Sequence, residues 1–246
     1  MKNYKTLWLC SSALHTKHGV FSTEQRLEQT ISTLESIKKI DPNARILIIE
    51  SGAEASITEE ESEKLKPYIE GLLNFNPDNQ VQEIYKMAGD NWDVAKNLTE
   101  LVVFGKALDF IIRQQPELLE GIDRVFKISG RYKLNENFDI SKHIDQKMNE
   151  SYIFATRRPS QFPSIVTDGL THQVMSRLWS WPTQKTAMIF FRFNIMIEDF
   201  IGTMAQKKYR DIEHLLFKYF SGPYMVEIPV IGIEGEIGPN GTLVKD

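Results

Sequence analysis

Near its middle the chain reads Arg124-Val125-Phe126-Lys127-Ile128-Ser129-Gly130-Arg131-Tyr132-Lys133-Leu134. Val125, Phe126 and Ile128 are β-branched or aromatic, which predicts a strand for the first half of this stretch. The second half gathers two cations, a hydroxyl, a glycine and a phenol, at Lys127, Ser129, Gly130, Arg131 and Tyr132. In open α/β sheets, ligands bind at the carboxyl ends of the strands. We therefore expect residues 127–132 to line a ligand site.

Two residues of this stretch suit an anionic ligand. Gly130 has no side chain and lets the backbone approach a ligand closely. Arg131 offers a planar fork of donors that matches phosphate or carboxylate. The alternative is structural: Lys127 and Arg131 pair with surface acids, and Gly130 makes a turn.

Composition places the chain among ordinary globular proteins. It has 246 residues, of which 41% are hydrophobic and 25% charged, enough for one α/β domain with a sizeable core. The net charge of -4 argues against a general nucleic-acid binder. The single cysteine, Cys10, excludes an internal disulfide framework and a cysteine-rich zinc site, and its apolar neighbours predict burial. No segment is long and apolar enough to predict a membrane span, so we expect a cytoplasmic protein.

Hydrophobic periodicity predicts alternating strands and helices. The expected strands cover 6–10, 46–49, 81–87, 125–128, 151–156, 186–193 and 224–231. The first expected helix starts at a capping box formed by Ser22 and Gln25, and another begins at Thr58. Further helices are expected from Gly89-Asp90-Asn91 to Pro116 and over 137–148, 194–205 and 208–220. We expect residues 179–182 to be irregular and the tail from Gly232 to be loose.

This pattern predicts an α/β fold with a mostly parallel, Rossmann-like sheet flanked by helices. A strand, a helix and a strand open the chain, which makes a right-handed βαβ unit. The alternation is regular up to about residue 156, and residues 157–246 form a mixed, aromatic-rich region. We expect one domain over residues 1–246.

Several common catalytic motifs are absent from the sequence. It lacks Gly-x-Gly-x-x-Gly after the first strand, a phosphate loop ending in Gly-Lys-Ser/Thr, Gly-x-Ser-x-Gly and His-Glu-x-x-His. Polar loops instead follow successive predicted strands, at Ser11-Ser12, Glu50-Ser51-Gly52, Gly89-Asp90-Asn91 and 127–132. Hydroxyls, an acid and cations together suit a ligand that carries phosphates and hydroxyl groups, such as a nucleotide-sugar.

The order of these features resembles GT-A-type glycosyltransferases of the small bacterial and phage kind. The resemblance rests on the early strand–helix alternation, on Ile48-Ile49-Glu50-Ser51-Gly52 and on the 126–132 run, and it covers about two-thirds of the chain. It implies a GT-A sheet with a nucleotide-binding part over about 1–156 and an acceptor part over about 157–246. It implies transfer of a sugar from a nucleotide-sugar to a glycan, glycolipid or lipopolysaccharide-like acceptor.

The resemblance also assigns the donor contacts. The implied nucleotide-binding residues are Ser11, Ser12, Glu50, Ser51, Lys127, Ser129, Gly130 and Arg131. For Glu50 the alternative is a helix cap or a solvated turn.

The chain departs from the family where metal-using members carry Asp-x-Asp. Ser129-Gly130-Arg131 stands at that place, so the consistent hypothesis is a metal-independent enzyme in which Lys127 and Arg131 neutralise the diphosphate. A divalent metal held elsewhere remains open, with His214 as a weak candidate ligand.

An inverting transferase needs a carboxylate near the acceptor hydroxyl. The candidates are Asp168, Glu198 and Asp199, and His214 of the next predicted helix is expected to reach the same cleft. The alternatives are first-turn helix acids for Glu198 and Asp199 and a solvated face for Glu213 and His214.

The acceptor contacts are expected among aromatic residues. Tyr132, Trp179 and Trp181 are the candidates for a platform on which a sugar stacks. The alternative for the tryptophans is a role as core anchors.

Two other functions stay open. A non-catalytic nucleotide- or carbohydrate-binding protein would keep the fold without the chemistry, and the missing Asp-x-Asp and the undetermined base favour it. A nucleotidyltransferase would require magnesium and a triphosphate, and the missing Asp-x-Asp counts against it.

Overall fold

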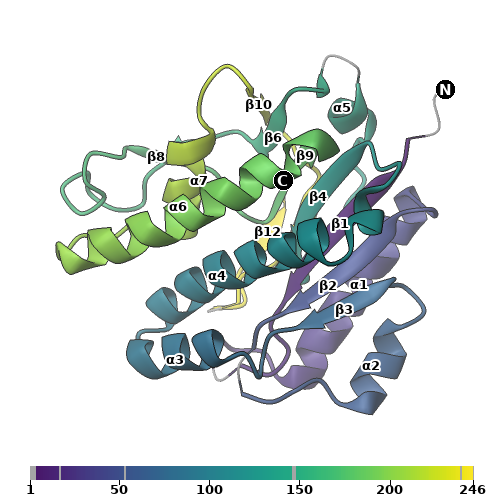
Figure 1. The fold of residues 1–246 in the computed structure, drawn as a ribbon, viewed down its shortest axis with the longest axis horizontal. Helices are drawn as coiled ribbons and strands as arrows, with labels where there is room; N and C mark the ends of the chain where they lie inside the picture. The colour runs from purple at the N-terminus through teal and green to yellow at the C-terminus, as the bar shows by residue number, and fades with distance from the viewer. Residues whose placement is uncertain (1–3, 17, 53, 146–147, 239, 246) are drawn as a thin grey trace.

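The centre of the molecule is a seven-stranded mixed sheet with helices on both faces (Figure 1). The structure is a computed structural model that describes residues 4–16, 18–52, 54–145, 148–238 and 240–245. The strand order is β10-β6-β9-β4-β1-β2-β3. These strands are β1 (Thr6–Ser12), β2 (Arg45–Glu50), β3 (Gly71–Asn74), β4 (Arg124–Ser129), β6 (Tyr152–Ala155), β9 (Leu178–Pro182) and β10 (Met225–Ile228). Only β9 runs antiparallel to its neighbours in this sheet, so the predicted α/β class with a mostly parallel sheet is confirmed.

Strand β1 is buried on both faces because successive side chains point to opposite sides of the sheet. Leu7 and Leu9 belong to the core on one face, and Trp8 and Cys10 to the core on the other. The first core is covered by α3 (Asn79–Ala88), α4 (Trp92–Arg113), α6 (Thr186–Ala205) and α7 (Ile212–Phe220). The second is covered by α1 (Thr23–Ile40) and α2 (Glu59–Leu65). Cys10 is buried as predicted, and burial raises the pKa of its thiol to about 12.

The predicted helix starts are formed by the expected caps. The Ser22 hydroxyl accepts a hydrogen bond from the Gln25 backbone N–H, and Gln25 Oε1 accepts one from the Ser22 backbone N–H. Thr58 begins α2 with the same capping box. Asn91 caps α4 by accepting from the Val94 backbone N–H at 3.3 Å, so the predicted helix from 91 to the residues before Pro116 is confirmed.

The strand predicted at 81–87 is wrong, because these residues belong to α3. Asp78 caps this helix by accepting from the Gln80 and Val81 backbone N–H groups, and Val81 and Ile84 are buried one helical turn apart. The third strand is β3, which lies earlier in the chain at Gly71–Asn74. Residues 89–91 therefore connect two helices and do not follow a strand.

The strand predicted at 186–193 is also wrong, because it is the first half of α6. The buried residues Ile189, Phe193, Met196 and Phe200 follow helical spacing, but Phe191 and other apolar residues lie on the exposed face and obscure the pattern. The stretch predicted as irregular, 179–182, lies in β9, which pairs with both β4 and β6.

Three further boundaries differ from the prediction. The helix predicted at 208–220 begins at Ile212, because Asp211 caps it. In place of a helix over 137–148 there is the single turn α5 (Ser141–Ile144), and residues 146–147 lie outside the described residues. The strands predicted at 151–156 and 224–231 are confirmed as the shorter β6 and β10.

The tail from Gly232 is ordered by a second sheet, contrary to prediction. Strand β11 (Ile233–Glu236) pairs antiparallel with β5 (Tyr132–Leu134) and with β12 (Leu243–Lys245). The turn that follows β11 returns to the start of the chain, because Gly238 O accepts from the Val20 N–H at 3.1 Å. A separate two-stranded sheet joins β7 (Arg158–Pro159) to β8 (His172–Gln173). Two short 3-10 helices, Pro116–Leu119 and Thr183–Lys185, connect other elements.

Sheet order places a crevice between β1 and β4. The chain builds β1, β2 and β3 toward one side, and β4 then pairs with the other side of β1. Loops that leave the carboxyl ends of β1 and β4 diverge at such a switch point, which is where open α/β sheets bind ligands. No helix in the described part of the chain is long and apolar enough to cross a membrane.

We expect Gly232→Ala to lower the free energy of unfolding by about 2 kcal/mol or more. Gly232 has φ +83°, and a Cβ there would lie 2.2 Å from the backbone nitrogen of Phe138, so both strain and a clash oppose the substitution. Urea unfolding measures the loss. The control is Gly202→Ala on the exposed face of α6, where a Cβ meets nothing within 4 Å; it should keep or raise stability. Equal stability of the two variants would contradict docking of the tail.

Candidate functional site

A cleft of about 690 Å³ opens at the carboxyl ends of β1 and β4. Seven of the residues predicted from the sequence line it, namely Ser11, Ser12, Ser51, Ser129, Gly130, Arg131 and Tyr132. The first part of α4, the residues before β9 and the start of α7 complete its walls, with Ile237 and Gly238 of the tail at one side. The predicted ligand loops therefore meet in one cavity at the switch point.

Gly130 lies where two strands and α1 converge. Its backbone N–H donates to Ser11 O at 2.8 Å. A Cβ at this position would lie 3.0 Å from Thr30 Oγ1 and 3.3 Å from Ser11 O, so a larger residue would push the β4 loop away from β1. The absence of a side chain keeps both backbones together at the floor of the cleft.

Glu50 supports the cleft from below and does not line it. Its side chain is 0% exposed, and Oε1 accepts from Leu14 N at 2.9 Å, Gly52 N at 3.1 Å and Asn76 Nδ2 at 3.5 Å. Burial raises the pKa of this carboxyl, against the hydrogen bonds that lower it. Glu50 thus ties together the loops after β1, β2 and β3, a structural role that differs from both the predicted nucleotide contact and the alternative of a helix cap or a solvated turn.

Lys127 is buried behind the cleft wall, with 2% of its surface exposed. Its Nζ contacts Glu100 Oε1 at 2.7 Å, Ser176 O at 2.8 Å and Ser129 Oγ at 3.1 Å. Three partners use the three donors of an ammonium group, so Lys127 has none left for a phosphate. Burial alone would raise the pKa of Glu100, but Lys127 and Lys96 outweigh it and lower it. The acid that Lys127 pairs with, Glu100, is partly buried and lines the cleft, so it is not the surface acid of the structural alternative.

Two arginines that line the cleft each have a buried nitrogen without a hydrogen-bond partner in the part of the chain that the structure describes. Arg131 Nε and Arg177 Nη1 are buried, and neither has a hydrogen-bond partner among the described residues. Arg177 lies over the Tyr132 ring at 5.2 Å, and the Arg131 guanidinium packs against Gly238, where a Cβ would lie 3.0 Å from its carbon. Buried donors are rarely left unpaired in proteins. Because both cationic side chains line the cleft, an anion is the ligand that suits this wall best.

Lys96 adds a third cation to the same cleft. Burial alone would lower the pKa of its ammonium group, but Glu100, Glu213 and Asp211 outweigh it and raise the pKa. Lys96 comes from the first turns of α4, which the sequence predicted as a helix without connecting it to the site.

The start of α7 brings two acids into the cleft. Asp211 accepts from the His214 backbone N–H at 2.9 Å and contacts His214 Nδ1 at 2.7 Å. Glu213 accepts from the Ser176 backbone N–H at 3.4 Å and from its Oγ at 3.3 Å. Burial raises the pKa of Glu213, with Lys96 opposing and Asp211 adding to the shift. His214 is fully buried, with Nε2 2.7 Å from Ser160 Oγ, so it does not lie on a solvated face.

The three acids predicted as bases lie outside the cleft lining. Asp199 accepts from Arg210 Nη1 at 2.7 Å, Lys218 Nζ at 2.6 Å and Tyr219 Oη at 3.0 Å. Asp168 pairs with Lys208 and with Arg210 Nη2. Glu198 is exposed on α6. Arg210 thus organises Asp168 and Asp199 into a charge cluster that ties α6 to the segment before β8.

The tryptophans predicted as a sugar platform are core residues. Trp179 is 1% exposed and stacks on Phe154 with ring centroids 5.1 Å apart. Trp181 is 0% exposed and donates from Nε1 to Thr186 Oγ1 at 3.1 Å. Neither can present a face to a ligand, because both point into the core between β9 and α6. Tyr132 lines the cleft, although it is also largely buried.

Aromatic residues other than Trp179 and Trp181 line the cleft. Trp92 is 42% exposed at the start of α4, and Tyr85 of α3 lies beside His18 with ring centroids 5.9 Å apart. The sequence signal for Trp92 was its position directly after Gly89-Asp90-Asn91, a loop already expected at the site. Among the described residues, no group of three or more His, Cys, Asp or Glu side chains is arranged to hold a metal. The hypothesis of a metal-independent enzyme stays a prediction.

No protein-family model matches this chain, and no curated protein is detectably similar to it in sequence.

We expect Glu213→Gln to stabilise the protein near pH 8 and to have little effect near pH 4, below the ordinary pKa of a glutamate at about 4.3. Because the folded-state pKa of Glu213 is raised, the unfolded chain ionises first as pH rises, and stability falls through that window. Glutamine removes this loss. Thermal unfolding at the two pH values measures the difference, with the exposed Glu198→Gln as control. Stabilisation of equal size at both pH values would contradict a raised pKa.

Proposed function

We propose that this protein is a GT-A-type glycosyltransferase that moves a sugar from a nucleotide-sugar donor to a glycan, glycolipid or lipopolysaccharide-like acceptor. The observation that carries the proposal is the cleft at the switch point between β1 and β4, where Arg131 and Arg177 hold unused buried donors. Nucleotides bind at this position in open α/β sheets. The resemblance of the 126–132 run to these enzymes supports the same assignment.

Different walls of the cleft suit different parts of a nucleotide-sugar donor. Ser11 and Ser51 line the side of β1 and β2, where their hydroxyls suit a ribose and a base edge, whereas the Ser12 hydroxyl is buried. Arg131 and Arg177 face the same space with planar donor forks that match a diphosphate. The negative charge that develops on the departing diphosphate is stabilised best by cations already fixed in place.

Packing holds these cations in position before any ligand arrives. Arg177 is held by the Tyr132 ring, and Arg131 by the turn at Gly238. Lys96 is held between Glu100 and the acids of α7. Cations fixed in this way support neutralisation of the leaving group by Arg131 and Arg177, in place of the Lys127 and Arg131 pair expected from the sequence. Lys127 contributes indirectly by fixing Glu100 and Ser129.

A second candidate function is ligand binding without chemistry. It is favoured by the acids of the cleft, of which Glu100 pairs with Lys127 and Asp211 with His214. Such a protein would bind the nucleotide-sugar and leave it intact. Both candidate functions require binding of the nucleotide-sugar, but only the transferase cleaves it.

We expect one of UDP, GDP, CDP or CMP to bind saturably, and Arg131→Ala to weaken that binding by about ten- to hundredfold, the value of one or two charge-assisted hydrogen bonds. Isothermal titration calorimetry with and without manganese measures the affinity and its metal dependence. Arg113→Ala is the matched control, because Arg113 pairs with Asp109 on the exposed side of α4.

The failure of all four nucleotides to bind would contradict the proposal. Unchanged nucleotide affinity in Arg131→Ala would show that the anion site does not lie at the β4 loop. Release of free sugar from the nucleotide-sugar whose nucleotide binds separates the transferase from the binding protein, since only the enzyme cleaves the donor.

A further inference from the structure

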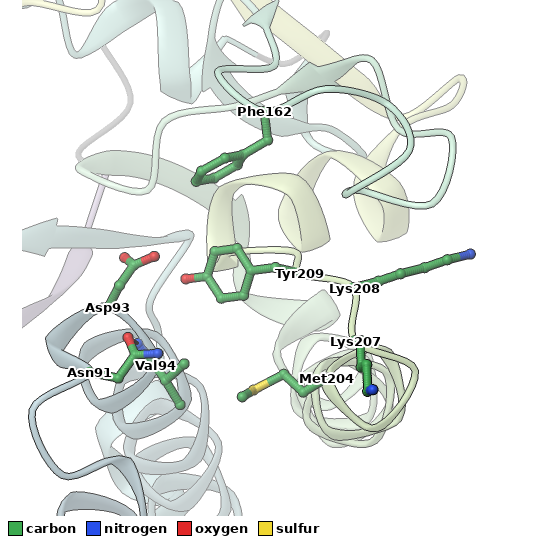
Figure 2. Close-up of a pocket in the computed structure, with 8 residues that line it drawn as sticks. All are labelled: Asn91, Asp93, Val94, Phe162, Met204, Lys207, Lys208 and Tyr209. Carbon is green, nitrogen blue, oxygen red and sulfur yellow. Dashed lines mark hydrogen bonds between the residues drawn. The ribbon is translucent and has the colours of Figure 1, made fainter.

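A second cavity of about 380 Å³ lies beside the cleft, between the start of α4, the end of α6 and the loop that leads to α7 (Figure 2). Its size is at the lower end of the range for small-molecule sites. Asp93 lines both cavities, and no other residue does so in the described part of the chain. A ligand in the second cavity would therefore meet a ligand in the cleft at Asp93.

The walls of this cavity combine aromatic rings with polar groups. Phe162 and Tyr209 stand edge to face, with ring centroids 5.5 Å apart and planes at 88°. Asn91 and Asp93 lie on the α4 side, and Met204 projects from the end of α6 (Figure 2). Aromatic faces beside amide and carboxylate groups suit a pyranose, which has apolar C–H faces and a rim of hydroxyls.

The charges around the cavity favour an uncharged ligand. Figure 2 shows the Lys207 and Lys208 side chains extending away from the space between Asp93 and Tyr209. Lys208 is paired with Asp168 outside this space. Asp93 is the remaining charged residue of the lining, so an anionic sugar would meet a carboxylate without a cation facing it.

Asp93 is held by two neighbours. Asn97 Nδ2 donates to Asp93 Oδ1 at 3.0 Å and to Tyr209 Oη at 2.8 Å. Burial raises the pKa of Tyr209, and the nearby Asp93 raises it further, so the phenol stays a neutral hydrogen-bond donor. These contacts fix the carboxylate at the boundary of the two cavities. Figure 2 shows the Tyr209 hydroxyl pointing toward Asp93.

We propose that this cavity is the acceptor subsite, that it takes a neutral hexopyranose, and that Asp93 is the base that receives the proton of the acceptor hydroxyl. The inference rests on the proposed function, since it needs a nucleotide-sugar in the cleft. The acceptor oxygen forms a bond to the anomeric carbon of the donor sugar. The bond from that carbon to the diphosphate breaks, the diphosphate leaves with the electron pair, and the hydroxyl proton goes to Asp93.

The subsite is tested with methyl glycosides of glucose, galactose and mannose, by saturation-transfer NMR on the whole chain. At least one glycoside should give signals from its ring protons, and Phe162→Ala should abolish them. Met204→Trp should do the same by filling the cavity from a partly exposed position, which guards against a folding defect in the first variant. The control is Phe191→Ala, because Phe191 is 63% exposed on α6 and lines neither cavity.

Asp93→Asn tests the base. Donor cleavage should fall by about a hundredfold or more, as expected for loss of a general base, while nucleotide affinity from calorimetry stays within about twofold. A cleavage rate that Asp93→Asn leaves unchanged would overturn the role of Asp93. Unchanged glycoside signals in both cavity variants would overturn the subsite.

Nucleotide titration keeps the two proposals separable. A wild-type protein that binds a nucleotide and shows no cavity-dependent glycoside signal retains the proposed function and loses the acceptor subsite. A wild-type protein that binds glycosides in the cavity but none of the nucleotides contradicts both the transferase and the acceptor role.

Discussion

The buried carboxylate of Glu50 holds the ligand side of the sheet together. One oxygen accepts backbone hydrogen bonds from the loops after β1 and β2 and a side-chain contact from Asn76 after β3. Burying a carboxyl away from water is unfavourable unless hydrogen bonds compensate, and here the compensating donors are the loops that form the cleft. The shape of the site and the stability of these loops therefore depend on the same atom. Ser12 and Ser51 line the cleft because this atom fixes the backbones that carry them, and Ser51 N also bonds Ser12 O at 3.0 Å.

Local sequence patterns predicted the strands that are buried on both faces and the helices that bury one face. Strands β1, β2 and β4 and helix α1 follow from apolar runs and a capping box, and residues 127–132 were placed at a ligand site by their chemistry alone. The helix predicted at 194–205 is the second half of α6, but the first half was predicted as a strand because α6 is apolar on both its buried and its exposed face, which removes the helical period. Trp179 and Trp181 were misassigned for a related reason: β9 lies between two strands that are distant in sequence, and no local signal shows that pairing.

The sequence does not show which distant acids and cations the fold brings together in the cleft. Lys96, Arg177 and Glu213 come from three separate segments, and each was unremarkable among neighbours of mixed charge. Their meaning appears only when the fold buries them together, where an unpaired donor on Arg177 becomes costly and a carboxyl on Glu213 resists ionisation. Asp168 and Asp199 show the converse, since both are candidate bases by residue type, yet the fold pairs both carboxylates with Arg210 and places them outside the cleft lining.

The docking of the tail couples the integrity of the core to the shape of the cleft. Gly238 packs on the Arg131 guanidinium and its carbonyl accepts from Val20 N–H, while β11 pairs with β5, the strand that follows Gly130. Ile231 and Ile233 of the same segment are buried in the core that α1 and α2 cover. Detachment of this segment would therefore expose apolar surface and remove the wall beside Arg131 in a single event.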